Sequence, residues 1–204
     1  EFLEQYYSPA DLKQYFAYMG LRNEAVHKVV GPNVPSQPGG EASLDIQYMM
    51  GISRNVRTWF WSVGGLHEGQ EPFLQWLIDL GQDASAPWVH STSYADEENS
   101  LSADYMQRIN VELQKAGVRG LTLLFSSGDD GVGGYSLRTN ATACSATFNP
   151  EFPPTSPYAT AVGVTQYLIN YLPICATTHF ACSEVGEVVS SSSTGSRITS
   201  GGGF

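Results

Sequence analysis

The chain has few basic residues and no long apolar run. Lys and Arg together number 10, against 20 Asp and Glu, which gives a formal net charge of −10 at pH 7. This acidic balance disfavours binding to nucleic acid and to anionic membrane surfaces. Nowhere does the sequence reach the run of about 18 apolar residues that a spanning helix needs. We therefore expect neither nucleic acid nor a membrane as a partner.

Cysteine is also scarce, at three residues in 204. Cys175 and Cys182 are close enough in sequence to close a small loop, which leaves Cys144 unpaired or paired outside this sequence. An odd count is compatible with part of a secreted protein and equally with a protein whose thiols stay reduced. Asn140-Ala-Thr142 is a sequon, so Asn140 is a predicted glycosylation site if the protein is secreted.

The sequence has neither an initial Met nor a signal sequence, and it ends on Gly-Gly-Gly-Phe204. We expect it to be part of a longer protein, so the missing signal says nothing about its compartment. Its hydrophobic content of 42% is sufficient for a core, and its charged content of 15% argues against disorder.

Short apolar runs alternate with segments of helical periodicity through most of the chain. Such alternation indicates right-handed βαβ units and a parallel sheet, so we predict an α/β fold. The alternation ends after Gln166. We predict a single domain over 1–204, with an exposed low-complexity insertion at about 170–199. The predicted helices are 8–20, 41–50 (ended by Gly51), 71–80 and 103–116, the predicted strands are 26–30, 56–61, 88–94, 121–125 and 158–164, and 95–102 is a predicted acidic loop.

The strand predicted at 121–125 opens into a glycine-rich turn that carries Asp129 and Asp130. Ligands of open α/β folds bind at the carboxyl ends of strands, so these acids lie where chemistry is expected. A protonated Asp129 could donate a hydrogen bond to a developing oxyanion, although Asp-Gly is also ordinary turn chemistry. A phosphate loop is excluded because no Lys follows and the glycine spacing is wrong. An EF-hand is excluded because the alternating acids and the terminal Glu are missing.

A second pair of acids, Glu41 and Asp45, lies four residues apart in a predicted helix. Residues at this spacing share one helix face. In a cleft of low dielectric constant, the two carboxylates would share one proton, which raises one pKa toward the range of a general base at acidic pH. An acidic helix start, with Glu41 near the positive end of the dipole and Asp45 facing water, explains the same residues.

Together the two groups of acids suggest a hydrolase that works at acidic pH and uses carboxylates as its catalytic groups, with the nucleophile missing from this sequence. We expect no catalytic histidine and no metal ligands within the chain. His67-Glu68 begins like a zinc-protease helix, but Glu71 stands where the second His should be and Pro72 follows it.

Four segments of the chain carry motifs of a known family: Glu41-Ala-Ser-Leu-Asp-Ile-Gln-Tyr48, His67-Glu-Gly-Gln-Glu-Pro-Phe-Leu-Gln-Trp76, Leu121-Thr-Leu-Leu-Phe-Ser-Ser-Gly-Asp129 and Ser200-Gly-Gly-Gly-Phe204. In this order they resemble the sedolisin family of serine-carboxyl peptidases, and most closely its animal lysosomal members that remove tripeptides. The resemblance runs from about Phe2 to Gln166 and resumes at Ser200. It implies a subtilisin-like parallel sheet flanked by helices, truncated at its C-terminal side.

The resemblance also implies catalytic roles. In the family, a Glu accepts the proton of a Ser nucleophile and a helical Asp orients that Glu; Glu41 and Asp45 match these residues. A further Asp, in the Ser-Gly-Asp turn, lines the oxyanion hole, and Asp129 matches it. The implied activity is the release of tripeptides from peptides or unfolded proteins with free N-termini at acidic pH.

Four further residues are implied to bind substrate. Ser127 and Gly128 belong to the turn of the oxyanion hole, and Ser93-Tyr94 matches the family's Ser-Tyr-Gly strand, which binds the substrate backbone. The resemblance also implies a lysosomal location, a propeptide in the precursor and a Ca²⁺ site. That site and the Ser-Gly-Thr-Ser motif of the nucleophile lie, in the family, beyond the part matched here, so we expect residues 1–204 alone to be inactive.

The chain departs from the family pattern at three of these places. Ala95 replaces the glycine of the substrate-binding strand, Asp130 stands where the family usually has Ser, and Gly134 replaces a cysteine of the animal enzymes. These departures favour an alternative, a peptidase-like binding protein that kept the fold and lost the chemistry.

Overall fold

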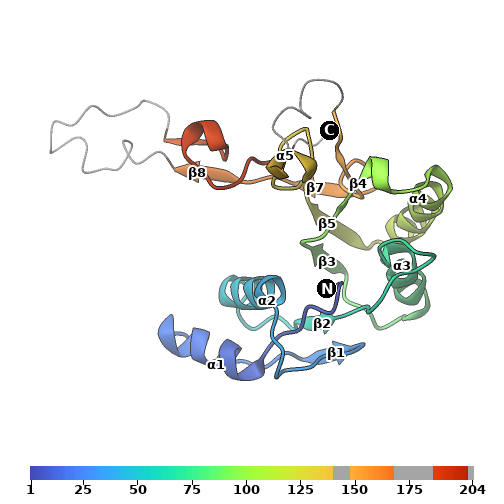
Figure 1. Cartoon of the computed structure of the whole chain (residues 1–204). Helices are drawn as coiled ribbons and strands as arrows, with labels where there is room; N and C mark the ends of the chain where they lie inside the picture. The colour runs from blue at the N-terminus through green and yellow to red at the C-terminus, as the bar shows by residue number, and fades with distance from the viewer. Residues whose placement is uncertain (140–147, 168–185, 202–204) are drawn as a thin grey trace, which may run out of the picture. The chain divides into compact units, whose positions relative to one another are not determined.

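The computed structural model describes residues 1–139, 148–167 and 186–201 (Figure 1). The chain divides into two compact units, each made of two stretches: residues 1–94 with 103–123 form unit 1, and residues 95–102 with 124–204 form unit 2. Asn140 and the three cysteines lie outside the described residues. The glycosylation and disulfide predictions therefore stay predictions.

Unit 1 alternates helices with short strands, as the periodicity predicts. β1 and β2 pair in parallel, with Val29 opposite Phe60, and α2 connects them. This pairing confirms the predicted βαβ arrangement and the α/β class. The elements are α1 (Pro9–Tyr18), β1 (Lys28–Val30), α2 (Gly40–Ile52), β2 (Trp59–Trp61), α3 (Phe73–Gln82), β3 (Val89–Thr92) and α4 (Ala103–Val118).

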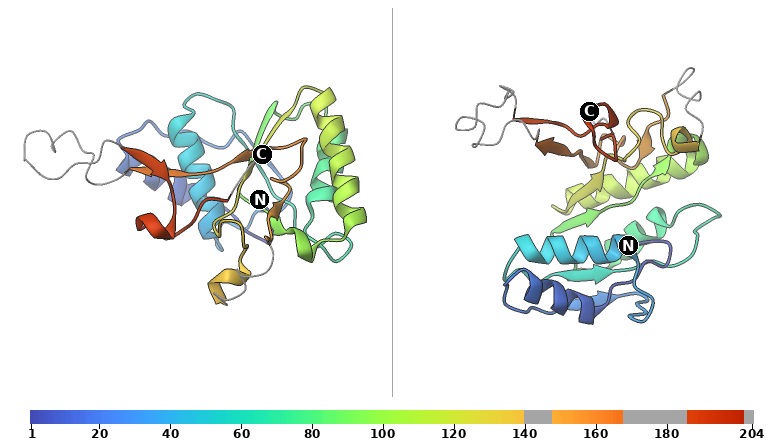
Figure 2. Two further views of the ribbon diagram at one scale, coloured as in Figure 1. Left: turned by 90° about the horizontal axis from the view of Figure 1, so that it is seen from above. Right: turned by 60° about the vertical axis from the view of Figure 1, so that its left-hand side comes forward.

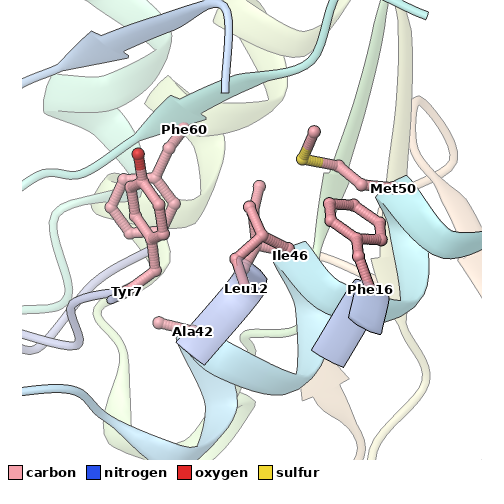
Figure 3. Close-up of a cluster of buried hydrophobic side chains, with 7 residues drawn as sticks. All are labelled: Tyr7, Leu12, Phe16, Ala42, Ile46, Met50 and Phe60. Carbon is pink, nitrogen blue, oxygen red and sulfur yellow. The ribbon is translucent and has the colours of Figure 1, made fainter. Parts of the chain in front are cut away.

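A buried apolar cluster holds α1, α2 and β2 together (Figure 3). On α2, the buried side chains are Ala42, Ile46 and Met50, which recur every fourth residue and so line one helix face. Glu41 and Asp45 each precede a buried residue by one position, so they lie beside the buried face. The remaining members of the cluster are Tyr7, Leu12, Phe16 and Phe60.

The two ends of the α1–α2 pair show one confirmed prediction and one error. Ser8 caps α1, since its Oγ accepts a hydrogen bond from the backbone N–H of Asp11 at 3.2 Å. The expectation that Gly51 ends the second helix is wrong, because α2 continues to Ile52. A Cβ at Gly51 would lie 2.6 Å from the Tyr15 hydroxyl, so this glycine provides room for α1 instead of ending α2.

The rest of unit 1 is built on the pair of helices α3 and α4, which pack along each other (Figure 2). The backbone N–H of Leu74 donates to the hydroxyl of Tyr105, which is buried between them, at 3.3 Å. The backbone N–H of Thr122 donates to the carbonyl of Trp88 at 2.8 Å, next to the start of β3.

Unit 2 consists of short strands joined by long turns. The last residues of β5 pair in parallel with β7, with Phe125 opposite Ala161. The pairs β4–β6 and β8–β9 are antiparallel. The elements of this unit are β4 (Asp96–Glu97), η1 (Glu98–Ser100), β5 (Thr122–Ser126, which begins in unit 1), α5 (Ser136–Thr139), β6 (Glu151–Phe152), β7 (Thr160–Val162), β8 (Thr165–Tyr167), β9 (Glu187–Val189) and η4 (Ser192–Thr194).

Two expectations for unit 2 require correction. The acidic segment 95–102, predicted as a loop, contains β4 and a 3₁₀ turn, because Asp96 pairs across the ladder with Phe152. The serine-rich stretch predicted to be exposed contains Ser190, which is only 3% exposed. The backbone N–H of Ser190 donates to the carbonyl of Val164 at 3.0 Å, continuing the β8–β9 pair. Residues 192–194 are exposed as expected.

Among the helices in residues 1–139, 148–167 and 186–201, none is both long enough and apolar enough to cross a membrane.

Candidate active site

Glu41 and Asp45 lie one turn apart in the first half of α2, and both side chains are half-buried. The helix begins without a side-chain cap, with Gly39 at the N-cap position and Glu41 in the first turn. A carboxylate at this end is stabilised by the helix dipole. The position of Glu41 is therefore explained by its place at the start of the helix alone. Whether the pair also forms part of a site depends on the neighbours of Asp45.

Asp45 is held by a side chain from another strand. The hydroxyl of Ser93 donates to Oδ1 of Asp45 at 2.9 Å, across 48 positions of sequence. Ser93 directly follows Thr92, the last residue of β3, at a strand's carboxyl end, where α/β folds bind ligands. Unit 1 therefore brings together Glu41, Asp45 and Ser93, three of the residues predicted from the sequence. Asp45 does not merely face water.

The neighbouring Tyr94 is anchored by packing. Its ring meets the ring of Phe2 edge-on, with centroids 5.6 Å apart, and Phe2 is almost completely buried. This contact fixes the course of the backbone after β3, the segment predicted to bind substrate.

A third carboxyl group, which the sequence patterns missed, lies beside Asp45. Burial raises the pKa of the Glu1 carboxyl to about 7; the α-ammonium of Glu1 opposes this shift, and the charge and hydrogen-bonding of Asp45 and the charge of Glu41 act in the same direction as burial. In its protonated form, Glu1 can donate a hydrogen bond to Asp45. Because Glu1 and Asp45 lie far apart in sequence, no spacing pattern could have identified the contact.

In unit 2, the turn Ser127–Gly128–Asp129 directly follows β5. Gly128 has a φ of +90°, which glycine adopts readily and other residues rarely do. The N–H of Ser127 donates to the carbonyl of Val162 at 3.0 Å, and the N–H of Gly201 donates to the carbonyl of Gly128 at 2.9 Å. The turn predicted to form the oxyanion hole is therefore fixed by backbone hydrogen bonds on both sides.

Asp129 and Asp130 share one cation, Arg138 from α5. Nε of Arg138 donates to Oδ1 of Asp130 at 2.6 Å, and Nη2 lies 3.6 Å from Oδ2 of Asp129. The Asp130 side chain is only 10% exposed, whereas that of Asp129 is 53% exposed. Arg138 thus compensates the charge that Asp130 adds beside Asp129. The sequence reasoning did not single out this arginine.

Glu151 is the other group of unit 2 that the sequence reasoning missed. It stands directly opposite Glu97 in the β4–β6 pair. A Cβ at Gly128 would lie 2.5 Å from its carboxyl carbon, so the Glu151 carboxyl reaches the turn itself. Burial, together with the charges of Asp130, Asp129 and Glu97, raises the pKa of Glu151 to about 7, while the charge of Arg138 acts in the opposite direction.

The predicted site residues thus fall into two groups, one in each unit. Glu41, Asp45, Ser93 and Tyr94 belong to unit 1, and the turn 127–129 belongs to unit 2. Among the residues that the structure describes, no group of three or more His, Cys, Asp or Glu is arranged to hold a metal ion.

Comparison with known proteins identifies relatives of the chain. No family model matches it. Tripeptidyl-peptidase 1 of Homo sapiens and that of Pongo abelii are each 48% identical to it over 175 residues, which is 84% of this chain and 30% of each relative. Tripeptidyl-peptidase 1 of Mus musculus is 46% identical over the same length. The chain therefore spans less than a third of the length of these curated relatives.

A solved structure supports the fold. The structure of Pseudomonas sedolisin (serine-carboxyl proteinase), complexed with two molecules of pseudo-iodotyrostatin, has a TM-score of 0.59 and 22% identity, and the match covers 81% of this chain and 48% of that chain. This likeness confirms the predicted subtilisin-like α/β architecture. Together with the 48% identity to tripeptidyl-peptidase 1 over 84% of this chain, it supports the resemblance of the chain to the sedolisin family of serine-carboxyl peptidases.

Proposed function

We propose that the full-length protein that contains this chain is a serine-carboxyl peptidase that releases tripeptides from free N-termini of peptides and unfolded proteins at acidic pH. The identity of 48% to tripeptidyl-peptidase 1 supports the reaction class. The observation that carries the proposal is the hydrogen bond from Ser93 to Asp45 at 2.9 Å. It holds the predicted orienting residue one helical turn from Glu41.

The proposed mechanism is acyl transfer. The hydroxyl of a Ser nucleophile, which we expect outside residues 1–204, attacks the carbonyl carbon of the third peptide bond while Glu41 accepts its proton. Asp45 orients Glu41, and a protonated Asp129 donates a hydrogen bond to the oxyanion. Glu41 then gives the proton to the leaving amine, and water hydrolyses the acyl-enzyme. Ser93, Tyr94, Ser127 and Gly128 are proposed to hold the substrate backbone.

The setting of the reaction is proposed by analogy with the family. It comprises a lysosomal location, a precursor with a propeptide and a Ca²⁺ site in a part of the domain that residues 1–204 do not contain. No step of the mechanism passes through that ion.

The first test concerns residues 1–204 by themselves. Because the nucleophile is expected elsewhere, the purified segment should release no tripeptide from a fluorogenic tripeptidyl amide at pH 3 to 6. Detectable release that Glu41→Gln abolishes would contradict this expectation, because a nucleophile would then have to lie within the segment.

The second test concerns Ser93 in the full-length protein. Ser93→Ala removes a hydrogen bond to a charged group, which contributes about 1.5–3 kcal/mol, so kcat/KM for the tripeptidyl amide should fall about tenfold or more. Ser93→Thr keeps the hydroxyl and should restore most of the rate. Ser91→Ala, at an exposed position of β3, is the matched control. Equal rates for the Ser91→Ala and Ser93→Ala variants would remove the Asp45 contact from the mechanism.

The alternative is a peptidase-like binding protein without turnover. The ion pair between Arg138 and Asp129 at 3.6 Å favours it, because the carboxyl accepts in such a pair, whereas an oxyanion needs a hydrogen-bond donor. Binding of an unblocked peptide by calorimetry, with no cleavage of it between pH 3 and 7, would support this alternative.

A further inference from the structure

Two glutamates support the turn 127–134 from the β4–β6 strand pair. Glu97 and Glu151 are cross-strand partners, so their side chains lie on the same face of the pair. Glu151 reaches Gly128, where a Cβ would lie 2.5 to 2.7 Å from its carboxyl atoms. Glu97 reaches Gly134 in the same way, because a Cβ there would collide with its carboxyl oxygen. The two carboxyl groups therefore occupy the space under the two glycines that bracket Asp129.

The charges around this contact are unbalanced. The groups that act on Glu151 are the carboxyls of Asp130, Asp129 and Glu97 and the guanidinium of Arg138. Arg138 is already engaged by Asp130 at 2.6 Å. Among the described groups that act on Glu151, one guanidinium stands against the carboxylates when all four carboxyls are ionised, and like charges directly opposite each other in a strand pair are destabilising. The arrangement is therefore compatible with a neutral Glu151 and strained by an ionised one.

We propose that Glu151 is a positioning residue for Asp129: its uncharged carboxyl packs under Gly128 and keeps the turn in place, and its ionisation repels the turn. This inference rests on the proposed role of Asp129 in the oxyanion hole. It adds a second requirement for acid, since the support of the turn and the donor within it both need a proton.

The direction of the pH dependence follows from the environment of Glu151. Burial raises its pKa to about 7 in the folded protein, above the ordinary value of 4.5. The folded state therefore binds this proton more tightly than the unfolded state. The resulting stabilisation is fully present below pH 4.5 and is lost as the pH rises through about 7. A glutamine at this position keeps the shape of the protonated acid and cannot ionise.

The experiment compares pH profiles of the full-length protein and its variants between pH 3 and 8, as kcat and KM for a fluorogenic tripeptidyl amide and as thermal unfolding midpoints. Glu151→Gln should move the alkaline limb of kcat upward by about one pH unit, with the same change in the pH dependence of the unfolding midpoint. Glu151→Ala leaves a void under Gly128 and should lower kcat about tenfold at every pH, a loss that Gln reverses. Glu187→Gln, an exposed strand glutamate whose partner is Thr165, should change neither profile.

Two results would overturn the inference. One is a Glu151→Gln profile that superimposes on those of the wild type and of Glu187→Gln. If Glu151→Gln does not fold, Glu97→Gln takes its place, because it removes the same repulsion from the opposite strand and should give the same upward shift of the alkaline limb. The second result that would overturn the inference is a Glu97→Gln profile without this shift. The proposed function fails separately, if Glu41→Gln and Asp129→Ala leave the rate unchanged. A rate that falls in those two variants, with no shift for Glu151→Gln, rejects the positioning role alone.

Discussion

Asp129→Ala should lower kcat of the full-length protein about a hundredfold or more at acidic pH, with little change in KM. The loss falls on kcat because an oxyanion exists in the transition state and not in the bound peptide. The turn itself should survive the substitution. It is fixed by backbone hydrogen bonds from Ser127 and Gly201, and the Asp129 side chain is 53% exposed.

Two further substitutions make this test specific. Asp129→Asn keeps a hydrogen-bond donor at every pH, because an amide donates without being protonated. This variant should therefore retain more activity than Asp129→Ala, and its kcat should fall less steeply as the pH rises toward neutral. Asp130→Ala is the matched neighbour, which removes the main partner of Arg138 without touching the proposed donor. A smaller loss for Asp129→Ala than for Asp130→Ala would contradict the assignment, as would a rate near that of the wild type.

Glu41→Ala is the second change with a large expected effect, again about a hundredfold or more in kcat. In the proposed mechanism Glu41 accepts the proton of the nucleophile, so its removal leaves no group in that mechanism to accept the proton. Glu41→Gln tests the chemistry more narrowly, because the amide preserves the packing in the first turn of α2 and cannot accept the proton. Both variants should therefore lose the rate to a similar extent.

The control for Glu41 is a helical glutamate outside the proposed mechanism. Glu112 on α4 pairs with Lys115 at 2.6 Å, and Glu112→Gln should leave kcat unchanged. Circular dichroism and the unfolding midpoint verify that each variant folds. Rates for Glu41→Gln within about twofold of the wild type would exclude proton transfer to this residue.

The sequence was informative where structure follows from local patterns. The helix predicted at 41–50 corresponds to α2, and the i, i+4 spacing of Glu41 and Asp45 places both on one side of it. The apolar run ending at Phe125 likewise predicts β5 and the turn at its carboxyl end. Both groups of predicted site residues could be located in this way.

The sequence was uninformative where partners come from distant parts of the chain. The strand pair β4–β6 is only two residues long on each side, too short for an alternating pattern, so the opposition of Glu97 and Glu151 could not be predicted. The contact of Glu1 with Asp45 could not be predicted either, because the two residues lie far apart in sequence. Arg138 lies eight positions from Asp130, in a polar segment whose fold no periodicity predicts.

The central claim is that carboxyl groups perform the proton transfers that imidazole performs in other serine peptidases. The pH profile of kcat/KM of the full-length protein tests it most directly. We predict a bell-shaped profile with its maximum on the acidic side, because Glu41 must be ionised while Asp129 stays protonated. A rate that rises through pH 7 to an alkaline plateau, as expected for an imidazole base, would contradict the account.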